Sequence, residues 1–237
     1  MKKALKIIGG ILFIMIVLAA IAWFGFLKPE PLPISANDRA AVNLVPLPSQ
    51  MKLGKGGFLL DSELAHEFTG LASPRLKKAV YRFYEKLNRQ SGLDLGTGIN
   101  KVLILECIGN ERQYPSLGDD ESYSIKVSEK KIIVKASEET GIIYALESLL
   151  QLARLEEGIW VIPSLSIDDQ PRYPWRGLMI DACRHWIPKE VVLRNLEAMG
   201  TVKMNVFHWH LTESQAFRVE SKLFPKLHTL GSRGDYY

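Results

Sequence analysis

An uncharged apolar run near the start of the chain constrains its fold more than any other feature. The run extends from Ile7 to Leu27, and lysines at positions 2, 3 and 6 precede it. As a helix, a run of this length crosses a hydrocarbon core of roughly 30 Å. It predicts a transmembrane helix, and the lysines place Met1 in the cytoplasm and everything after Leu27 on the far side of the membrane.

Residues 1–27 are therefore interpreted as a signal anchor or a cleaved signal peptide. The sequence Ala20-Ile21-Ala22 offers a small-x-small cleavage site, but the bulky residues Trp23 and Phe24 follow it directly. The apolar run also exceeds the roughly 7–15 residues of a cleavable peptide, so we favour the anchor. The body of the protein is then periplasmic or extracellular, membrane-anchored through residues 7–27, or secreted if the helix is cleaved.

The rest of the chain has the composition of a folded protein. Apolar residues make up 47% and charged residues 24%, which excludes a disordered chain. Two cysteines exclude a disulfide framework, and a mild net charge of +4, spread along the sequence, gives no support for nucleic-acid binding. We expect a Pro-rich linker over residues 28–41, an α+β accessory domain over 42–169, and a second domain over 170–237.

Patterns in residues 42–169 mix helices and strands without strict alternation, which predicts an α+β sandwich. Ser73-Pro74 starts a helix that Ser91-Gly92 ends. The predicted strands and the second helix cover Lys101–Cys107, a hairpin of Tyr123–Val127 and Lys131–Ala136, and a helix capped by Ser137 and closed by Gly158. Asp119-Asp120-Glu121 is interpreted as an exposed acidic turn.

Residues 170–237 begin a parallel α/β domain and do not finish it. A strand over Leu178–Cys183, a helix from Pro188 to Gly200 and a strand over Met204–Leu211 form one βαβ unit. Only 26 residues follow Leu211, whereas a (β/α)8 barrel needs roughly 250.

Candidate site residues lie at the carboxyl ends of these two strands, where parallel α/β folds place their working groups. Arg184 and His185 follow the first strand, and Glu213 follows the second. The Arg184 guanidinium suits a carboxylate, a phosphate or a pair of sugar hydroxyls. The alternative is that it neutralises Asp181 or Glu213 within the scaffold.

Two other chemistries fit the same segment less well. His185, His208 and His210 would make a three-histidine zinc site, but we favour the alternative that they pack inside the barrel and bond to neighbouring strands or to Glu213. Cys183 and His185 would form a nucleophile pair only on a regular strand, and no oxyanion donor accompanies them. We therefore expect no metal and no cofactor.

Residues 171–237 resemble the opening of the catalytic barrel of glycoside hydrolase family 20, the β-N-acetylhexosaminidases. The matching phrases are Trp175-Arg176-Gly177-Leu178-Met179-Ile180-Asp181, Cys183-Arg184-His185 and Lys203-Met204-Asn205-Val206-Phe207-His208-Trp209-His210-Leu211. Upstream, Val45-Pro46-Leu47-Pro48 and the hairpin and helix of Tyr123–Leu152 look like the family's accessory domain.

This resemblance implies substrate-assisted, retaining hydrolysis of terminal N-acetylglucosamine or N-acetylgalactosamine from a glycan. Arg184 matches the arginine that grips hydroxyls of the non-reducing sugar, and Asp181, His185 and Glu213 would support the site. In the family an Asp-Glu pair performs the chemistry after a later strand, so we expect it beyond Tyr237 and expect the 237-residue chain to be inactive.

Two departures from the family leave room for another interpretation. Glu213 and Ser214 stand where the family usually has two aspartates, which puts the pocket geometry in doubt. The alternative function is a non-enzymatic, membrane-anchored remnant in which only residues 42–169 fold, because an isolated βαβ unit leaves apolar surface uncovered. Rapid proteolysis beyond residue 170 would distinguish this remnant from a folded barrel segment.

Overall fold

The computed structural model describes residues 42, 44–112 and 114–233, all of which belong to the compact unit Pro33–Tyr237. The expected signal segment at 1–27 and the expected linker at 28–41 lie outside these residues.

The expected N-terminal transmembrane helix is not supported, and this part of the fold-class prediction is corrected. None of the helices in the described part of the chain combines the length and apolar character needed to cross a bilayer. The longest of them, α2 (Pro74–Ser91), buries one face and carries Lys77, Lys78, Arg82 and Glu85 elsewhere along its length. Its charges suit a helix that covers a sheet rather than one surrounded by lipid.

A seven-stranded mixed sheet forms the first half of the described chain. Its order is β1-β7-β4-β5-β3-β2, with β6 paired to β7. Strands β2, β3 and β5 are parallel, and the remaining pairs are antiparallel. The strands are β1 (Gln50–Leu59), β2 (Leu64–Gly70), β3 (Asn100–Cys107), β4 (Tyr123–Val127), β5 (Ile132–Ala136), β6 (Arg154–Glu156) and β7 (Ile159–Asp169).

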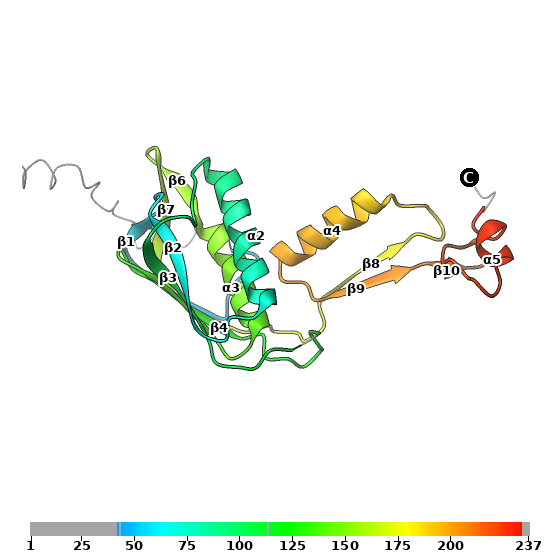
Figure 1. Ribbon diagram of the computed structural model, residues 1–237, viewed down its shortest axis with the longest axis horizontal. Helices are drawn as coiled ribbons and strands as arrows, with labels where there is room; N and C mark the ends of the chain where they lie inside the picture. Colours follow the sequence, from blue (N-terminus) through cyan, green and yellow to red (C-terminus); the bar gives the residue numbers. More distant parts are fainter. Residues whose placement is uncertain (1–41, 43, 113, 234–237) are drawn as a thin grey trace, which may run out of the picture. The chain divides into compact units, whose positions relative to one another are not determined.

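Helices α2 and α3 (Glu139–Leu152) lie side by side against this sheet and enclose the main core (Figure 1). Alternate residues of the strands point at the helices, so the period-two pattern of β4 and β5 buries one face. The core joins these strand residues to the apolar stripes of both helices and includes Leu76, Leu87, Leu103, Leu105, Ile125, Ile132, Ile142, Leu149 and Ile167.

The α+β prediction for this half is confirmed in its main elements. Ser73 caps α2 by accepting a hydrogen bond from the Leu76 N–H at 3.1 Å, and Gly92 ends the helix with a φ of 73°. The predicted hairpin is the antiparallel pair β4–β5. The predicted cap and end of α3 are wrong: the helix starts after Glu138 without a side-chain cap and ends at Leu152, while Gly158 belongs to the β6–β7 turn.

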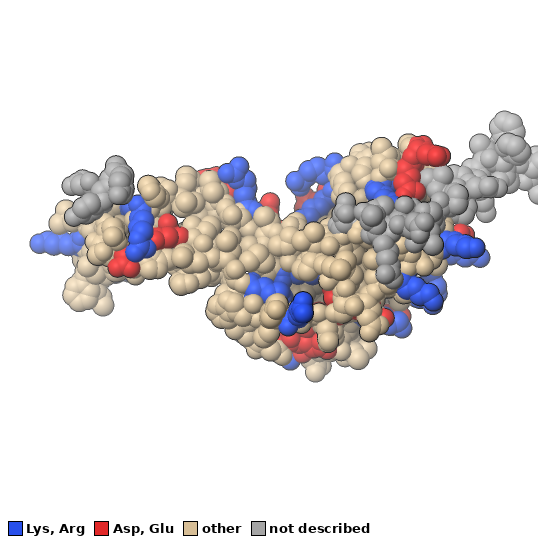
Figure 2. Space-filling view, turned by 180° about the vertical axis from the view of Figure 1, so that it is seen from behind, with Lys and Arg blue, Asp and Glu red and all other residues tan. Residues whose placement is uncertain are grey.

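The second half contains the expected βαβ unit. Strands β8 (Gly177–Asp181) and β9 (Val206–His210) are parallel neighbours, connected by α4 (Lys189–Thr201). A two-stranded hairpin of β10 (Thr212–Glu213) and β11 (Ala216–Phe217) and the short helix α5 (Lys226–Thr229) follow. On the face drawn in Figure 2, basic and acidic side chains of the described residues are interspersed rather than gathered by sign.

We predict that Ser73→Ala destabilises the protein by about 1–3 kcal/mol. Ser73 caps α2 and its hydroxyl also donates to Glu139, a carboxylate that is only 3% exposed, so its loss removes two hydrogen bonds at once. Denaturant unfolding followed by circular dichroism measures the change. The matched control is Ser62→Ala, an exposed serine between β1 and β2, which should change stability by less than about 0.5 kcal/mol. Equal effects of the two substitutions would contradict the capping role.

Candidate functional site

Arg176 joins the βαβ unit to the first half of the protein. Its side chain donates to the Glu121 carboxylate at 2.7 Å, to the Tyr173 carbonyl at 2.6 Å and to the Lys203 carbonyl at 2.8 Å. The guanidinium also lies over the Tyr144 ring, 5.8 Å from its centre. The Arg176 and Glu121 side chains are only 15% and 11% exposed, so this is a largely desolvated ion pair.

Lys203 forms the second link between the two halves. The residue is buried, and its ammonium donates to the Tyr123 hydroxyl at 2.6 Å and to the Asp169 carboxylate at 3.2 Å. Burial lowers the pKa of Lys203, and the charge of Asp169 opposes that shift. Lys203 also has a φ of 59°, a left-handed conformation that is uncommon for a non-glycine residue.

The interpretation of Asp119-Asp120-Glu121 as an exposed acidic turn holds for Asp120, which is exposed. It is wrong for Asp119 and Glu121, whose side chains are only 4% and 11% exposed. Glu121 pairs with Arg176 and accepts a second hydrogen bond, from the Asn205 amide at 3.1 Å. Asp119 pairs with Arg112 and accepts the Ser116 N–H, and that backbone bond is the largest cause of its lowered pKa. Of these three acids, Glu121 is the one that contacts the βαβ unit.

Arg184 lies directly beyond the carboxyl end of β8, as the sequence predicts, and it contacts both acids proposed as its scaffold partners. Its guanidinium donates to Asp181, and the Glu213 carboxylate lies 3.7 Å away. Asp181 also accepts the backbone N–H groups of Cys183 and Arg184, at 3.0 and 3.1 Å. Because 52% of the Arg184 side chain is exposed, the group is oriented by carboxylates and still faces solvent.

This arrangement determines the ionisation of Asp181. The hydrogen bond from the Arg184 guanidinium, together with the two backbone N–H groups, lowers the pKa of Asp181 to about 2. Asp181 is therefore a permanent anion at neutral pH and does not serve as a proton donor.

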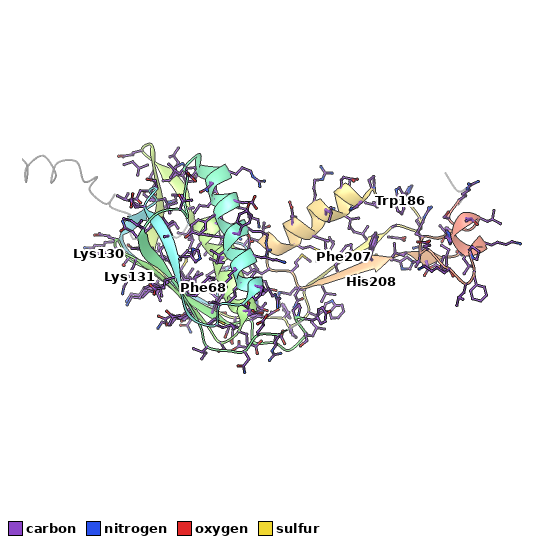
Figure 3. The ribbon with its side chains drawn as sticks, viewed as in Figure 1. Phe68, Lys130, Lys131, Trp186, Phe207 and His208 are labelled. Atoms are coloured by element: carbon purple, nitrogen blue, oxygen red, sulfur yellow. The ribbon has the colours of Figure 1, made fainter. Side chains whose placement is uncertain are left out.

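The three candidate histidines, at positions 185, 208 and 210, do not form one cluster. His185 is exposed in the turn after β8, and His208 is exposed on β9, where Figure 3 labels it. The His208 and His210 rings lie on the same strand with centroids 6.2 Å apart. Among the described residues, the donor cluster suited to a metal consists of Asp181, Cys183 and His210, so the three-histidine set is not formed.

Cys183 is likewise not paired with His185. Its side chain is buried beneath the β8 turn and its thiol contacts the Ala216 carbonyl at 3.4 Å. Burial raises the pKa of Cys183, and the charge of Asp181 adds to the effect, so the sulfur is a thiol at neutral pH. The predicted nucleophile pair is therefore not supported.

Comparison with known proteins places both halves in one family. The profile described as "Glycosyl hydrolase family 20, domain 2" matches residues 41–170, and that described as "Glycosyl hydrolase family 20, catalytic domain" matches residues 173–236. Beta-hexosaminidase subunit beta of Mus musculus is 36% identical over 155 residues, which cover 65% of this chain and 29% of that protein. Beta-hexosaminidase of Vibrio furnissii is 32% identical over 203 residues, covering 84% and 31%.

A solved structure agrees with these sequence matches. The chitobiase of Flavobacterium johnsoniae superposes with a TM-score of 0.77 at 38% identity, covering 83% of this chain and 31% of that one. The chain thus spans about a third of the length of the relatives it matches.

We predict that Arg176→Met loosens the βαβ unit. The substitution leaves Glu121 largely buried without its cation, which costs about 3 kcal/mol. Chymotrypsin should then cleave within residues 177–233 faster than in the unmodified chain, because cleavage follows local opening. Arg172→Met, which removes an exposed neighbouring arginine, is the matched control and should leave the cleavage rate unchanged. Unaltered cleavage in both variants would contradict the docking role.

We predict that Arg184→Met raises the pKa of Asp181 from about 2 toward the ordinary value of about 3.9. A depressed folded-state pKa means that the pair stabilises the fold fully above pH of about 4, and that this contribution is lost as the pH falls toward 2. Carbon-13 NMR titration of the Asp181 carboxyl measures the shift. Arg194→Met, on the exposed side of α4, should leave the pKa of Asp181 low. A low pKa that persists in Arg184→Met would contradict the pairing.

Proposed function

The chain belongs to glycosyl hydrolase family 20, and we propose that it contributes the accessory domain and the first βαβ unit of a β-N-acetylhexosaminidase. Such an enzyme hydrolyses terminal, non-reducing N-acetylglucosamine or N-acetylgalactosamine from glycans. The relatives named beta-hexosaminidase and the structurally similar chitobiase support this substrate class.

The observation that carries the proposal is the state of Arg184. A half-exposed guanidinium at the carboxyl end of a parallel strand lies where α/β proteins bind their ligands. Asp181 contacts one terminal nitrogen of the guanidinium and Glu213 lies 3.7 Å from the other. Because the guanidinium has five N–H donors, further donors remain for a ligand. Two neighbouring hydroxyls of a sugar match the spacing of that fork, so Arg184 would bind the non-reducing sugar.

The rest of the proposed mechanism follows the substrate-assisted scheme of this family. The acetamido oxygen of the substrate attacks its own anomeric carbon, an aspartate orients the acetamide, and a glutamic acid protonates the leaving oxygen. Asp181 does not fill the role of the proton donor because Arg184 holds it as an anion.

Glu213 and Ser214 affect how the proposed pocket is shaped. Glu213 reaches to 3.7 Å from both the Arg184 guanidinium and the His210 ring, so the longer side chain still contacts the sugar-binding residue. Ser214 is exposed, and its hydroxyl donates to the Gln215 side chain at 3.1 Å instead of supporting Arg184. We infer that Asp181 and Glu213 support Arg184 in this chain, one at each terminal nitrogen of the guanidinium.

We predict that the 237-residue chain binds N-acetylglucosamine weakly and does not hydrolyse it. Saturation-transfer NMR measures binding, and release of an aryl group from an aryl N-acetylglucosaminide measures hydrolysis. Arg184→Met should abolish the binding signal, whereas Arg194→Met, the exposed control on α4, should retain it.

Two results would contradict this proposal. Turnover by the purified chain that survives controls would show that the proton donor is already present in these residues. Sugar binding that is unchanged in Arg184→Met would remove the guanidinium from the proposed site.

A further inference from the structure

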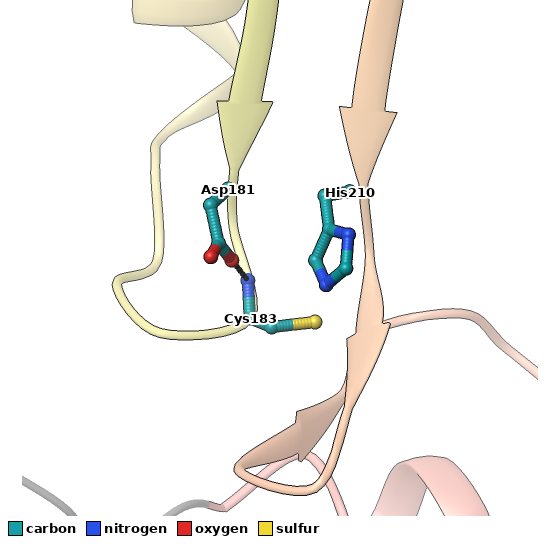
Figure 4. Close-up of side chains that lie close together, drawn as sticks. All are labelled: Asp181, Cys183 and His210. Carbon is teal, nitrogen blue, oxygen red and sulfur yellow. Dashed lines mark hydrogen bonds between the residues drawn. The ribbon is translucent and has the colours of Figure 1, made fainter.

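Three side chains of different chemistry converge at the carboxyl end of the β8–β9 pair. Asp181 and His210 are register partners on the two parallel strands, and Cys183 follows β8 by two residues. Figure 4 shows the thiol and the imidazole turned toward the same space beside the Asp181 carboxylate. One carboxylate oxygen, the sulfur and one ring nitrogen all lie within 4.8 Å of one another.

One ring nitrogen of His210 is free to bind a ligand in this cluster. Its Nε2 atom is buried and has no hydrogen-bond partner, and the nearest carboxylate oxygen, from Glu213, is 3.7 Å away. A buried polar atom without a partner costs free energy, so it marks a place where a ligand would be favourable. Cys183 is only 1% exposed and makes one long contact to the Ala216 carbonyl.

We propose that Asp181, Cys183 and His210 bind a zinc ion. Thiolate sulfur, imidazole nitrogen and carboxylate oxygen are the three ligand types of protein zinc sites, and zinc accepts them in tetrahedral geometry. The mixed set with a soft sulfur disfavours magnesium and calcium, which take oxygen ligands. The fourth position falls to water or to Glu213, which borders His210.

The charges around the site fit a divalent cation. The carboxylates of Asp181 and Glu213 and the Cys183 thiolate supply three negative charges, which balance Zn²⁺ together with the Arg184 guanidinium. On binding, the Cys183 thiol loses its proton to solvent and a zinc–sulfur bond forms, with no change of oxidation state. The backbone N–H groups of Cys183 and Arg184 hold the Oδ1 atom of Asp181. The metal would therefore take the Oδ2 atom, which also accepts a hydrogen bond from the Arg184 guanidinium.

This site differs from the sugar-binding role of Arg184, and it does not depend on the proposed function. Its ligands belong to the chain itself, so zinc binding is measured without any glycan and without activity. It also differs from the three-histidine set that the sequence offered and that we did not expect to bind metal, because only His210 is shared.

The test is metal binding by the reduced, metal-free 237-residue chain. Competition with a chromophoric chelator measures zinc affinity, and titration with Co²⁺ reports thiolate coordination through a sulfur-to-metal absorption band. Cys183→Ser should abolish that band, and His210→Gln should weaken zinc binding by at least about tenfold, since even outer-shell changes have that effect. The matched controls are Cys107→Ser, the other buried cysteine, and His208→Gln, on the same strand.

The controls should keep both the absorption band and the zinc affinity. Circular dichroism of each variant separates loss of a ligand from loss of the fold. The proposal is overturned if Co²⁺ binds without the sulfur band, if the band persists in Cys183→Ser, or if Cys107→Ser abolishes it equally. It is also overturned if the folded, unmodified chain does not compete with the chelator for zinc.

Discussion

The ion pair between Arg176 and Glu121 connects the two halves of this chain. Arg176 precedes β8 by one residue and Glu121 precedes β4 by two. Their ion pair therefore connects the starts of two strands that belong to separate sheets. Because both side chains are largely desolvated, neither is stable there without the other. Lys203, which follows α4, and Asp169 form a second ion pair between the two halves. These two ion pairs fix the base of the βαβ unit, and Arg184 lies at the opposite end of β8.

Local signals predicted local structure well. Ser73 and Gly92 mark the ends of α2 because cap and C-terminal residues act through neighbouring backbone groups, and the β4–β5 hairpin follows from strict alternation. Strands β1 and β7 were not predicted from the sequence pattern. Residues 54–57 of β1 include three glycines and a register shift, which obscure the alternation, and pairing with the distant β7 maintains the strand.

The sequence predicted where the candidate site residues lie along the strands, but not which side chains they contact. The rule that working groups lie at strand ends places Arg184 beyond β8, and the structure adds that Asp181 and Glu213 hold it. The docking roles of Arg176, Lys203 and Glu121 depend on partners tens of residues away, which periodicity does not reveal. The approach of Cys183 to His210 depends on the β8–β9 register and on the turn after Asp181, and adjacency in sequence had instead suggested His185.

The left-handed backbone of Lys203 affects whether the accessory domain can be separated from the βαβ unit. A residue in this conformation, with its ammonium buried against Tyr123 and Asp169, links the α4–β9 connection to the first sheet. Excising the first half at residue 170 would remove Arg176 and Lys203, the cations that pair with Glu121 and Asp169, and would expose both carboxylates to water. Recombination between family members therefore keeps these two ion pairs only if the accessory domain and the first βαβ unit are exchanged together.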